Sequence, residues 1–159
     1  VFAITDPAIR QEKQLLWLDA DVEFIKEWDT EFLGKVTPPD VMGSYLGRFQ
    51  MLTSECGWVF YNLAQGAGRF LDRFREIYVS GEIYDHLEWH DSYIFDRVRE
   101  EIGGEWLNIS EGVPGMHVWD DCILGLYMKH LKGPARKEGV TPGNGQIPDD
   151  YWSQKELIA

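Results

Sequence analysis

The chain has 159 residues, enough for one domain to bury a substantial core, and its 44% apolar and 14% aromatic content argues against disorder. Fifteen Lys and Arg against 27 Asp and Glu give a formal net charge of −12 at pH 7. This balance argues against a nucleic-acid backbone or an anionic membrane surface as the partner, because both are bound by clustered cations.

The first predicted elements surround a short apolar strand. Loose helical spacing over 3–13 predicts a helix, and the apolar run at 15–18 predicts a strand that is buried on both faces. The stretch 23–40 has the composition of a loop with a short helix at 30–34. Weak alternation over 41–49 and a clearer apolar run over 57–63 predict two further strands.

The second half of the chain alternates predicted helices with one strand. Helical spacing of apolar residues predicts helices at 66–78, 89–101 and 120–132, and residues 106–109 have the pattern of a short strand. Residues from 133 onward are rich in Gly and Pro. We therefore expect one domain over 1–140 and a tail over 141–159 that packs on its surface.

Two carboxylates, Asp19 and Asp21, follow directly after the apolar run at 15–18. In extended backbone their spacing points both side chains the same way, and ligands of open α/β sheets bind beyond the carboxyl ends of the strands. A divalent cation with oxygen ligands relieves the repulsion between two such carboxylates. The pair predicts a metal that carries a substrate phosphate, although an acidic turn that merely closes the strand explains it as well.

Three other polar positions fall where a plain core does not place them. Asp91 is in register with the apolar stripe of the helix at 89–101, beside Glu88 and His90, so we expect it to point inward. The alternative is a helix N-terminal carboxylate that binds free backbone N–H groups. Glu55 precedes the strand at 57–63 and is drawn inward with it or solvated at its start.

A histidine near the end of the chain has notable neighbours. His130 is in register with the apolar face of the predicted helix at 120–132, where a histidine bonded to backbone is the alternative to a ligand. It is followed by Gly133, Arg136 and Lys137. An imidazole, a glycine that permits close approach and two cations together suit a metal-bound diphosphate.

Four segments resemble nucleotide-sugar glycosyltransferases of the GT-A fold, in the order found in that family. They are LLWLDAD at 15–21, SECGWVFYNL at 54–63, WHDSYIF at 89–95 and HLKGPARK at 130–137. The last is similar to a His-x-x-Gly-x-x-Lys element of retaining, galactosyltransferase-like members, with Arg136 in place of the Lys and Lys137 next to it. The resemblance implies an α/β, GT-A-like fold with an open mixed sheet flanked by helices.

The resemblance also implies roles for particular residues. Asp19, Asp21 and His130 would hold Mn²⁺ or Mg²⁺ on the diphosphate of a donor such as a UDP-sugar, a carbohydrate or other hydroxyl compound being the acceptor. The same family pattern implies roles for the other candidate residues. Those expected to bind the cofactor or diphosphate are Asp19, Asp21, Gly133, Arg136 and Lys137, and those expected near the reacting groups are Asp91, Glu55 and His90.

One departure from the family concerns the start of the chain. Only 14 residues precede the strand at 15–18, whereas the GT-A fold has a whole nucleotide-binding half before it, so we expect the chain to represent the C-terminal portion of such a domain. Two alternatives stay open. One is a phosphohydrolase of the haloacid-dehalogenase type, and the other is a non-catalytic carbohydrate-binding or assembly module.

Compartment follows from what the sequence lacks. No run approaches the roughly 18 apolar residues of a transmembrane helix, and we recognise no secretory signal. Cys56 and Cys122 match no metal-binding or redox spacing, so we expect both thiols to be reduced and buried. These features predict a cytoplasmic protein without a transmembrane segment.

Overall fold

The fold was analysed in a computed structural model that describes residues 3–6, 11–48, 53–115 and 117–131. Its strands are β1 (Gln14–Leu18), β2 (Val22–Phe24), β3 (Gly43–Leu46), β4 (Glu55–Asn62), β5 (Trp106–Asn108) and β6 (Met128–His130). Its α-helices are α1 (Thr30–Val36), α2 (Ala67–Ser80), α3 (Asp91–Ile102) and α4 (Val118–Asp121). Short 3₁₀ helices are η2 (Leu63–Gln65), η3 (Glu82–Asp85) and η4 (Ile123–Leu126).

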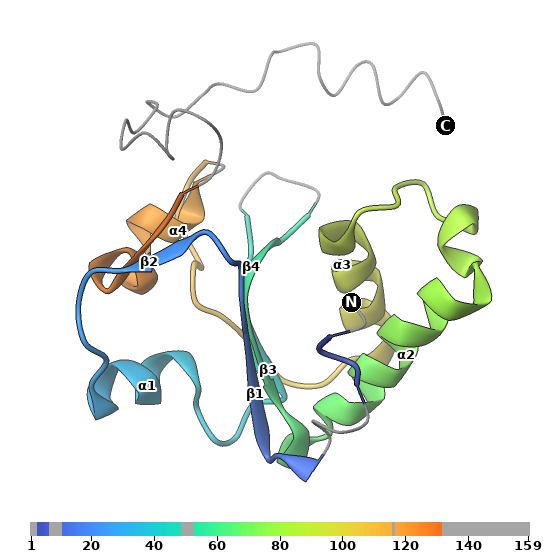
Figure 1. Cartoon of the computed structure of the whole chain (residues 1–159), viewed down its shortest axis with the longest axis horizontal. Helices are drawn as coiled ribbons and strands as arrows, with labels where there is room; N and C mark the ends of the chain where they lie inside the picture. Colours follow the sequence, from blue (N-terminus) through green and yellow to red (C-terminus); the bar gives the residue numbers. More distant parts are fainter. Residues whose placement is uncertain (1–2, 7–10, 49–52, 116, 132–159) are drawn as a thin grey trace.

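An open mixed sheet separates two layers (Figure 1). Its strand order is β1-β4-β3-β5, in which β4 runs antiparallel to both neighbours and β3 runs parallel to β5. Helices α2 and α3 lie on one side of this sheet, and α1 and α4 lie on the other. The expected mixed α/β architecture, an open sheet flanked by helices, is confirmed at this level.

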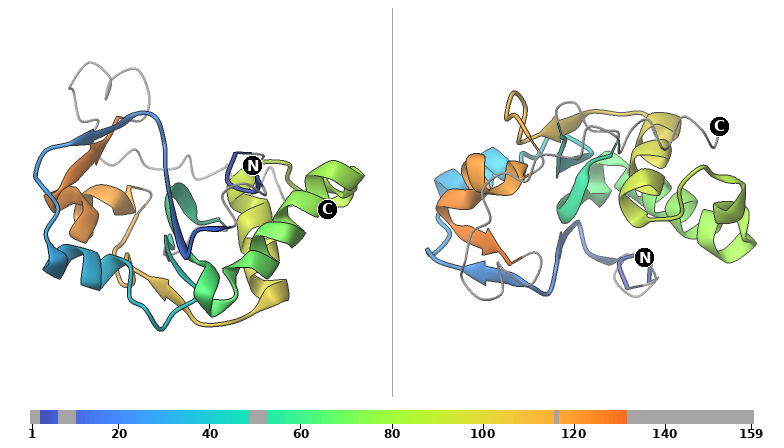
Figure 2. Two further views of the ribbon diagram at one scale, coloured as in Figure 1. Left: turned by 60° about the horizontal axis from the view of Figure 1, so that its bottom comes forward. Right: turned by 90° about the horizontal axis from the view of Figure 1, so that it is seen from above.

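A second, two-stranded sheet lies beside the main one. It consists of β2 and β6, which pair antiparallel and bring the start of the chain against residues 128–130 (Figure 2). The ribbon leaves the main sheet at the end of β1 and lies on the same side as α1 and α4. The sequence interpretation treated this part of 23–40 as loop and missed β2.

Alternation along β4 divides the core into two apolar clusters. Val59 and Tyr61 face α2 and α3, where they meet the buried stripe of Phe70, Phe74 and neighbouring residues. Trp58 faces the opposite layer, formed by α1, α4, η4 and β6. The long helix α2 is amphipathic, as its spacing predicts, and ends at Gly81, whose φ of 83° suits a residue without Cβ.

The strands and the helices at 30–34, 66–78 and 89–101 are confirmed within a few residues of their predicted bounds. The helix predicted at 3–13 is wrong for its described part, since residues 3–5 form a turn. The predicted burial of 15–18 on both faces is also wrong: β1 is at the edge of the sheet, and Leu16 is 36% exposed.

The helix predicted at 120–132 is wrong as well. This stretch divides into α4, η4 and the strand β6. Gly125 interrupts it, and a Cβ there would lie 2.2 Å from the backbone oxygen of Asp120, so the chain turns where a helix would need to continue. Pairing of β6 with β2 then outweighs the helical spacing. Residue 132 and the predicted tail lie outside the described residues.

Candidate metal centre

Two carboxylates follow the end of β1 in a tight turn. The Asp19 N–H donates to Gly57 O at 3.0 Å, and the Val22 N–H donates to Asp19 O at 3.3 Å. The indole N–H of Trp17 donates to Asp19 Oδ1 at 3.3 Å. These bonds fix the turn against β4, so Asp19 and Asp21 are both held at the carboxyl end of β1.

His130 reaches the same place from the other end of the described chain. The register of the small sheet pairs it with Val22, and the Leu131 N–H donates to Asp21 O at 2.9 Å. His130 Nε2 lies 3.1 Å from Asp21 Oδ1 and 3.2 Å from Asp19 Oδ2. The structure therefore brings together the three residues proposed as metal ligands, although His130 stands on a strand and not on a helix.

The imidazole is buried, with 2% of its side chain exposed. Its ring lies against the Trp119 indole at a centroid distance of 4.8 Å. The Trp119 N–H in turn donates to Met128 O at 3.2 Å, which ties this indole to β6. A ring held in this way presents one nitrogen to the two carboxylates with little freedom to turn away.

Glu55 adds a third carboxylate at the start of β4. Ligand atoms of Asp19, Glu55 and His130 all lie within 4.8 Å of one another. Glu55 is buried, its Oε1 accepts from the Gly57 N–H at 3.1 Å, and its Oε2 pairs with the Arg48 guanidinium. The sequence interpretation placed Glu55 near the acceptor, whereas its geometry also makes it a candidate ligand.

A register shift explains why Glu55 faces the centre. Tyr45 pairs with Val59 but the next residue, Leu46, pairs with Glu55, so residues 56–58 have no partner on β3. Such an irregularity redirects side chains next to it. Both Glu55 and Gly57 are then close to Asp19 and His130.

Gly57 is where backbone and imidazole meet most closely. A Cβ at this position would lie 2.5 Å from His130 Cε1 and 3.2 Å from Asp19 Oδ2. Real Cβ atoms do not make the first of these contacts, so any side chain here would displace the histidine. The glycine in SECGWVFYNL is thus explained by the site itself.

Oxygen donors with a single imidazole form a ligand set that suits Mn²⁺. Carboxylates favour Mg²⁺, Ca²⁺ and Mn²⁺, while imidazole favours transition metals, and Mn²⁺ is one of the ions that accept both. His130 Nε2 carries a proton when it donates to the carboxylates and a lone pair when it ligates a cation. A bound cation would therefore replace the hydrogen bonds seen here and shift or release a proton.

Cys56 stands between Glu55 and Gly57 but belongs to the other face of β4, where it packs with the core next to α2 and α3. Burial raises the pKa of its thiol well above the ordinary value, and the Asp91 carboxylate adds to the effect. A thiol of this kind stays protonated at neutral pH. It is therefore neither a ligand nor a nucleophile of this centre.

Asp91 and His90 occupy the N-terminus of α3. Asp91 is exposed, so its predicted position on the buried stripe is wrong, because it is the first residue of the helix and its Oδ1 accepts from the Ser92 N–H at 2.8 Å. It still borders a small cavity of about 30 Å³ shared with Trp17 and Cys56. His90 caps the helix, since its Nδ1 accepts from the Tyr93 N–H at 3.2 Å.

The remaining partner of this helix cap is Glu88, which contacts His90 Nε2. With both ring nitrogens engaged, His90 has a structural explanation within the described residues. Gly133, Arg136 and Lys137 lie outside the described residues. Arg48, Gly57 and Trp119 were not anticipated; only Gly57, beside a candidate carboxylate in an apolar strand, carried a sequence signal.

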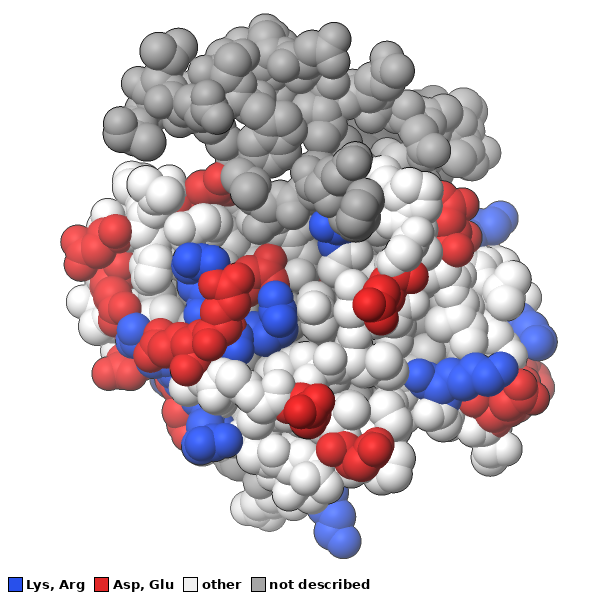
Figure 3. Space-filling model, turned by 180° about the vertical axis from the view of Figure 1, so that it is seen from behind, with Lys and Arg blue, Asp and Glu red and all other residues white. Residues whose placement is uncertain are grey.

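The surface and the membrane propensity agree with the composition. On the face seen in Figure 3, Lys and Arg side chains are scattered among Asp and Glu and form no broad basic patch over the described residues. Within the described ranges, no helix has the length and apolarity needed to cross a membrane.

Comparison with known proteins gave no relative. No family model, no curated protein and no solved structure matches the chain.

Proposed function

We propose that this chain acts as a metal-dependent glycosyltransferase that moves a sugar from a nucleoside-diphosphate donor, UDP in the first instance, to an acceptor hydroxyl. The observation that carries the proposal is the meeting of His130 Nε2 with Asp19 and Asp21 at 3.2 and 3.1 Å. These are the residues that the family resemblance assigns to one metal. The mixed open sheet flanked by helices supports a GT-A-like fold in its coarse features.

In this proposal some residues would bind the cation and others would orient its ligands. Asp19, Glu55 and His130, whose ligand atoms lie within 4.8 Å of one another, would hold the cation, and Asp21 would join them from its position 3.1 Å from His130 Nε2. When bound, Mn²⁺ or Mg²⁺ neutralises the charge that develops on the departing diphosphate. Trp17 and Trp119 fix the ligands' orientation.

Further groups act on the donor and acceptor. Arg136 and Lys137 would add charge-assisted hydrogen bonds to the diphosphate, as the resemblance implies. Asp91 opens α3 and borders a small cavity with Trp17 and Cys56, on the face of β4 opposite to Glu55. We assign it to the donor sugar.

A phosphohydrolase of the haloacid-dehalogenase type is less well supported. That chemistry requires the first aspartate as a nucleophile with a free oxygen. In this structure Asp19 Oδ1 accepts from the Trp17 indole and Oδ2 faces His130. The glycosyltransferase assignment gives His130 a role in this contact as a metal ligand, whereas the phosphohydrolase assignment gives it none.

Calorimetry with the full chain tests the proposal. We expect Mn²⁺ to bind, and UDP to give heat only when Mn²⁺ is present. Asp21→Asn keeps the shape of the side chain but removes a charged ligand, and should weaken Mn²⁺ binding at least about tenfold. Asp40→Asn, which makes the same replacement at an exposed carboxylate, is the matched control.

Electron paramagnetic resonance gives an independent count of bound Mn²⁺. If Asp21→Asn and Asp40→Asn bind Mn²⁺ alike, the centre is not where we place it. If Mn²⁺ binds but UDP adds no heat, the metal centre holds and the transferase assignment fails. Hydrolysis of p-nitrophenyl phosphate by the chain would favour the phosphohydrolase instead.

A further inference from the structure

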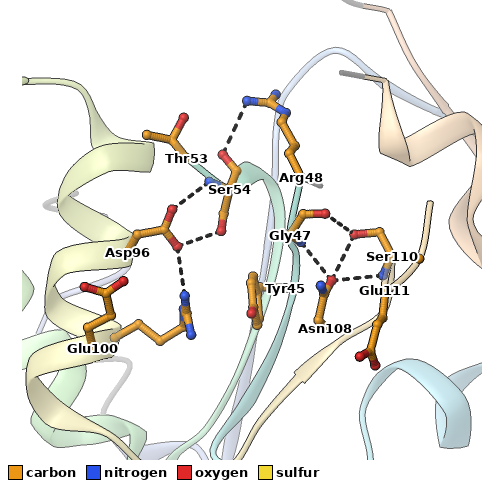
Figure 4. Close-up of a pocket in the computed structure, with 12 residues that line it drawn as sticks. Tyr45, Gly47, Arg48, Thr53, Ser54, Asp96, Glu100, Asn108, Ser110 and Glu111 are labelled. Carbon is orange, nitrogen blue, oxygen red and sulfur yellow. Dashed lines mark hydrogen bonds and ion pairs between the residues drawn. The ribbon is translucent and has the colours of Figure 1, made fainter. Parts of the chain in front are cut away.

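A separate cleft of about 410 Å³ lies next to the metal centre. Its walls come from three parts of the chain: the end of β3 with the residues just before β4, the middle of α3, and the end of β5 with the turn after it (Figure 4). This volume falls within the range of small-molecule sites. The proposed metal ligands Asp19, Asp21 and His130 do not line it.

The wall beside α3 is held by buried polar contacts. Asp96, which is 8% exposed, accepts from the Ser54 N–H at 2.7 Å and from the Ser54 hydroxyl at 2.6 Å. Figure 4 shows these two side chains joined across one end of the cleft. Because the bonds link α3 to β4, this wall keeps its shape without a ligand.

The opposite wall is equally preformed. Asn108 Oδ1 accepts from the Gly47 N–H at 2.8 Å, and the buried Ser110 hydroxyl donates to Gly47 O at 2.7 Å. These bonds tie the end of β3 to the turn after β5. A site that needs no reorganisation binds small ligands without paying to order its walls.

Charge in the cleft is balanced and slightly acidic. The guanidinium of Arg48 pairs with Glu55, and that of Arg99 lies 3.3 Å from Asp96 and over the Tyr45 ring at 4.5 Å. Both cations are thus compensated, and Glu100 pairs with Arg97 outside the lining, so Glu111 supplies the remaining negative charge at the lining. An anionic ligand is disfavoured here, and so is an apolar one, because Tyr45 supplies the only aromatic surface in the described lining.

Hydrogen-bonding capacity remains for a neutral ligand. The Arg99 side chain lines the cleft, and its Nε–H has no hydrogen-bond partner among the described residues, but this atom is covered and becomes accessible to a ligand only when the side chain shifts. The Glu111 carboxylate is exposed on the turn after β5 and can accept from hydroxyl groups. The lining of the cleft thus offers hydrogen-bond donors and acceptors but no net positive charge. This combination suits a ligand that carries many hydroxyl groups.

The cleft and the metal centre share a wall. Arg48 pairs with Glu55 through one nitrogen, and through the other it donates to the Ser54 backbone oxygen at 3.5 Å, at the edge of the cleft. Glu55 itself lies within 4.8 Å of the ligand atoms of Asp19 and His130. A ligand in the cleft therefore lies next to the centre, separated from it by one ion pair.

We propose that this cleft binds a neutral, hydroxyl-rich ligand, a sugar or other polyol. Resting on the proposed function, we assign this ligand as the acceptor, whose hydroxyl is held beside the metal-bound donor. The cleft disfavours acceptors that carry a phosphate or carboxylate on the bound part, because Glu111 repels them and both lining guanidinium groups already have carboxylate partners.

Amide chemical-shift mapping on the full chain without divalent ions tests the proposal. The probes are glucose, galactose and glycerol, with inorganic phosphate as the anionic comparison. We expect at least one neutral probe to shift the amides of Gly47, Ser110 and Gly112, and phosphate to leave them unchanged. Shifts elsewhere only, or a stronger response to phosphate, would overturn the assignment.

Two variants localise the binding. Glu111→Gln removes an acceptor charge and should weaken the neutral ligand about three- to tenfold, and Thr53→Trp should fill the cleft and abolish binding. Glu105→Gln, another exposed carboxylate but outside the lining, is the matched control. Equal affinity in all three variants would contradict the proposal.

The outcomes of this experiment can be distinguished from those of the experiment that tests the proposed function. Asp21→Asn should lose Mn²⁺ and keep the response of the cleft to the neutral ligand. Sugar binding in the cleft without Mn²⁺-dependent UDP binding would leave a carbohydrate-binding module. Mn²⁺ and UDP binding with an unresponsive cleft would leave the transferase and refute the subsite.

Discussion

The two sides of the main sheet differ in how they are built. The side of α2 and α3 is an apolar cluster in which aromatic rings contact one another, among them Phe70 and Phe95 at a centroid distance of 5.2 Å. The other side has shorter elements and holds His130 and Glu55 in buried positions. The first side also buries one carboxylate, Asp96, but Ser54 satisfies it with two hydrogen bonds, whereas His130 and Glu55 face other charged groups. Because buried titratable groups cost stability, the second side carries the larger cost.

Phe70→Ala is the strongest way to break the apolar side. Phe70 of α2 is fully buried against Phe95 of α3 and Trp106, so its truncation should lower the free energy of unfolding by about 3–5 kcal/mol. Urea unfolding followed by circular dichroism measures the loss. Val79→Ala, at an exposed position of the same helix, should change it by less than about 0.5 kcal/mol. Similar losses in both variants would mean that this side does not carry the stability.

Arg48→Met tests the polar side. The Arg48–Glu55 pair is largely buried, with 14% and 6% of the side chains exposed, so removing the cation leaves a buried carboxylate and should cost about 3 kcal/mol. Added Mn²⁺ should recover part of this loss, because the ion supplies the missing positive charge beside Glu55.

The control for this variant is Arg97→Met. Its partner Glu100 is exposed, so we expect a change of at most about 1 kcal/mol and no extra stabilisation by Mn²⁺. Urea unfolding with and without Mn²⁺ compares the two variants. If Mn²⁺ stabilises them equally, Glu55 does not contribute to the centre.

A pair of Gly→Ala variants sharpens the comparison at smaller cost. Gly57→Ala places a Cβ against His130 and should lower stability by about 1–3 kcal/mol while weakening Mn²⁺ binding. Gly34→Ala lies inside α1 with no atom within 4 Å of the new Cβ, and should raise stability by about 1 kcal/mol. Urea unfolding measures the change in stability, and calorimetry measures the Mn²⁺ affinity. Equal Mn²⁺ affinity of Gly57→Ala and Gly34→Ala would contradict the proposed position of the centre.

Thiol reactivity gives the smallest expected effect. Burial raises the pKa of both Cys56 and Cys122, so their reactive thiolate forms are scarce at neutral pH and increase as the pH rises toward the raised values. Iodoacetamide should modify neither thiol rapidly in the native protein and both in urea, as mass spectrometry would show. The exposed thiol introduced by Ser80→Cys is the reference, and equal rates for it and Cys56 would contradict the burial.

Local pattern predicted the fold well where elements are long or strongly apolar. Helices α2 and α3 and strand β4 follow from spacing that only one structure satisfies. The stretch 120–132 failed because its helical spacing competes with a glycine and with pairing to β2, a partner far away in the sequence. The sequence also did not indicate whether β1 is an edge strand or a central strand, because an apolar run does not specify which strands lie beside it.

The candidate site divides in the same way. Asp19 and Asp21 stand out because carboxylates follow an apolar strand, and His130 was associated with them through the family resemblance although its element was predicted wrongly. The proximity of Glu55 depends on the register shift opposite Tyr45 and Leu46, which no local pattern specifies. Nothing in the sequence around Arg48 marks it as part of the site, because its role depends on the ion pair with Glu55 that the fold creates.

The pairing of β2 with β6 has a consequence for how the protein reaches its folded state. Asp21 and His130 are 109 residues apart, and closing a loop of that length costs about 4 kcal/mol of chain entropy. Contacts this distant form after the local ones in α2 and α3. A partly folded chain can therefore possess most of its apolar core and still be unable to hold a cation, so tight ion uptake during refolding would time the last step of assembly.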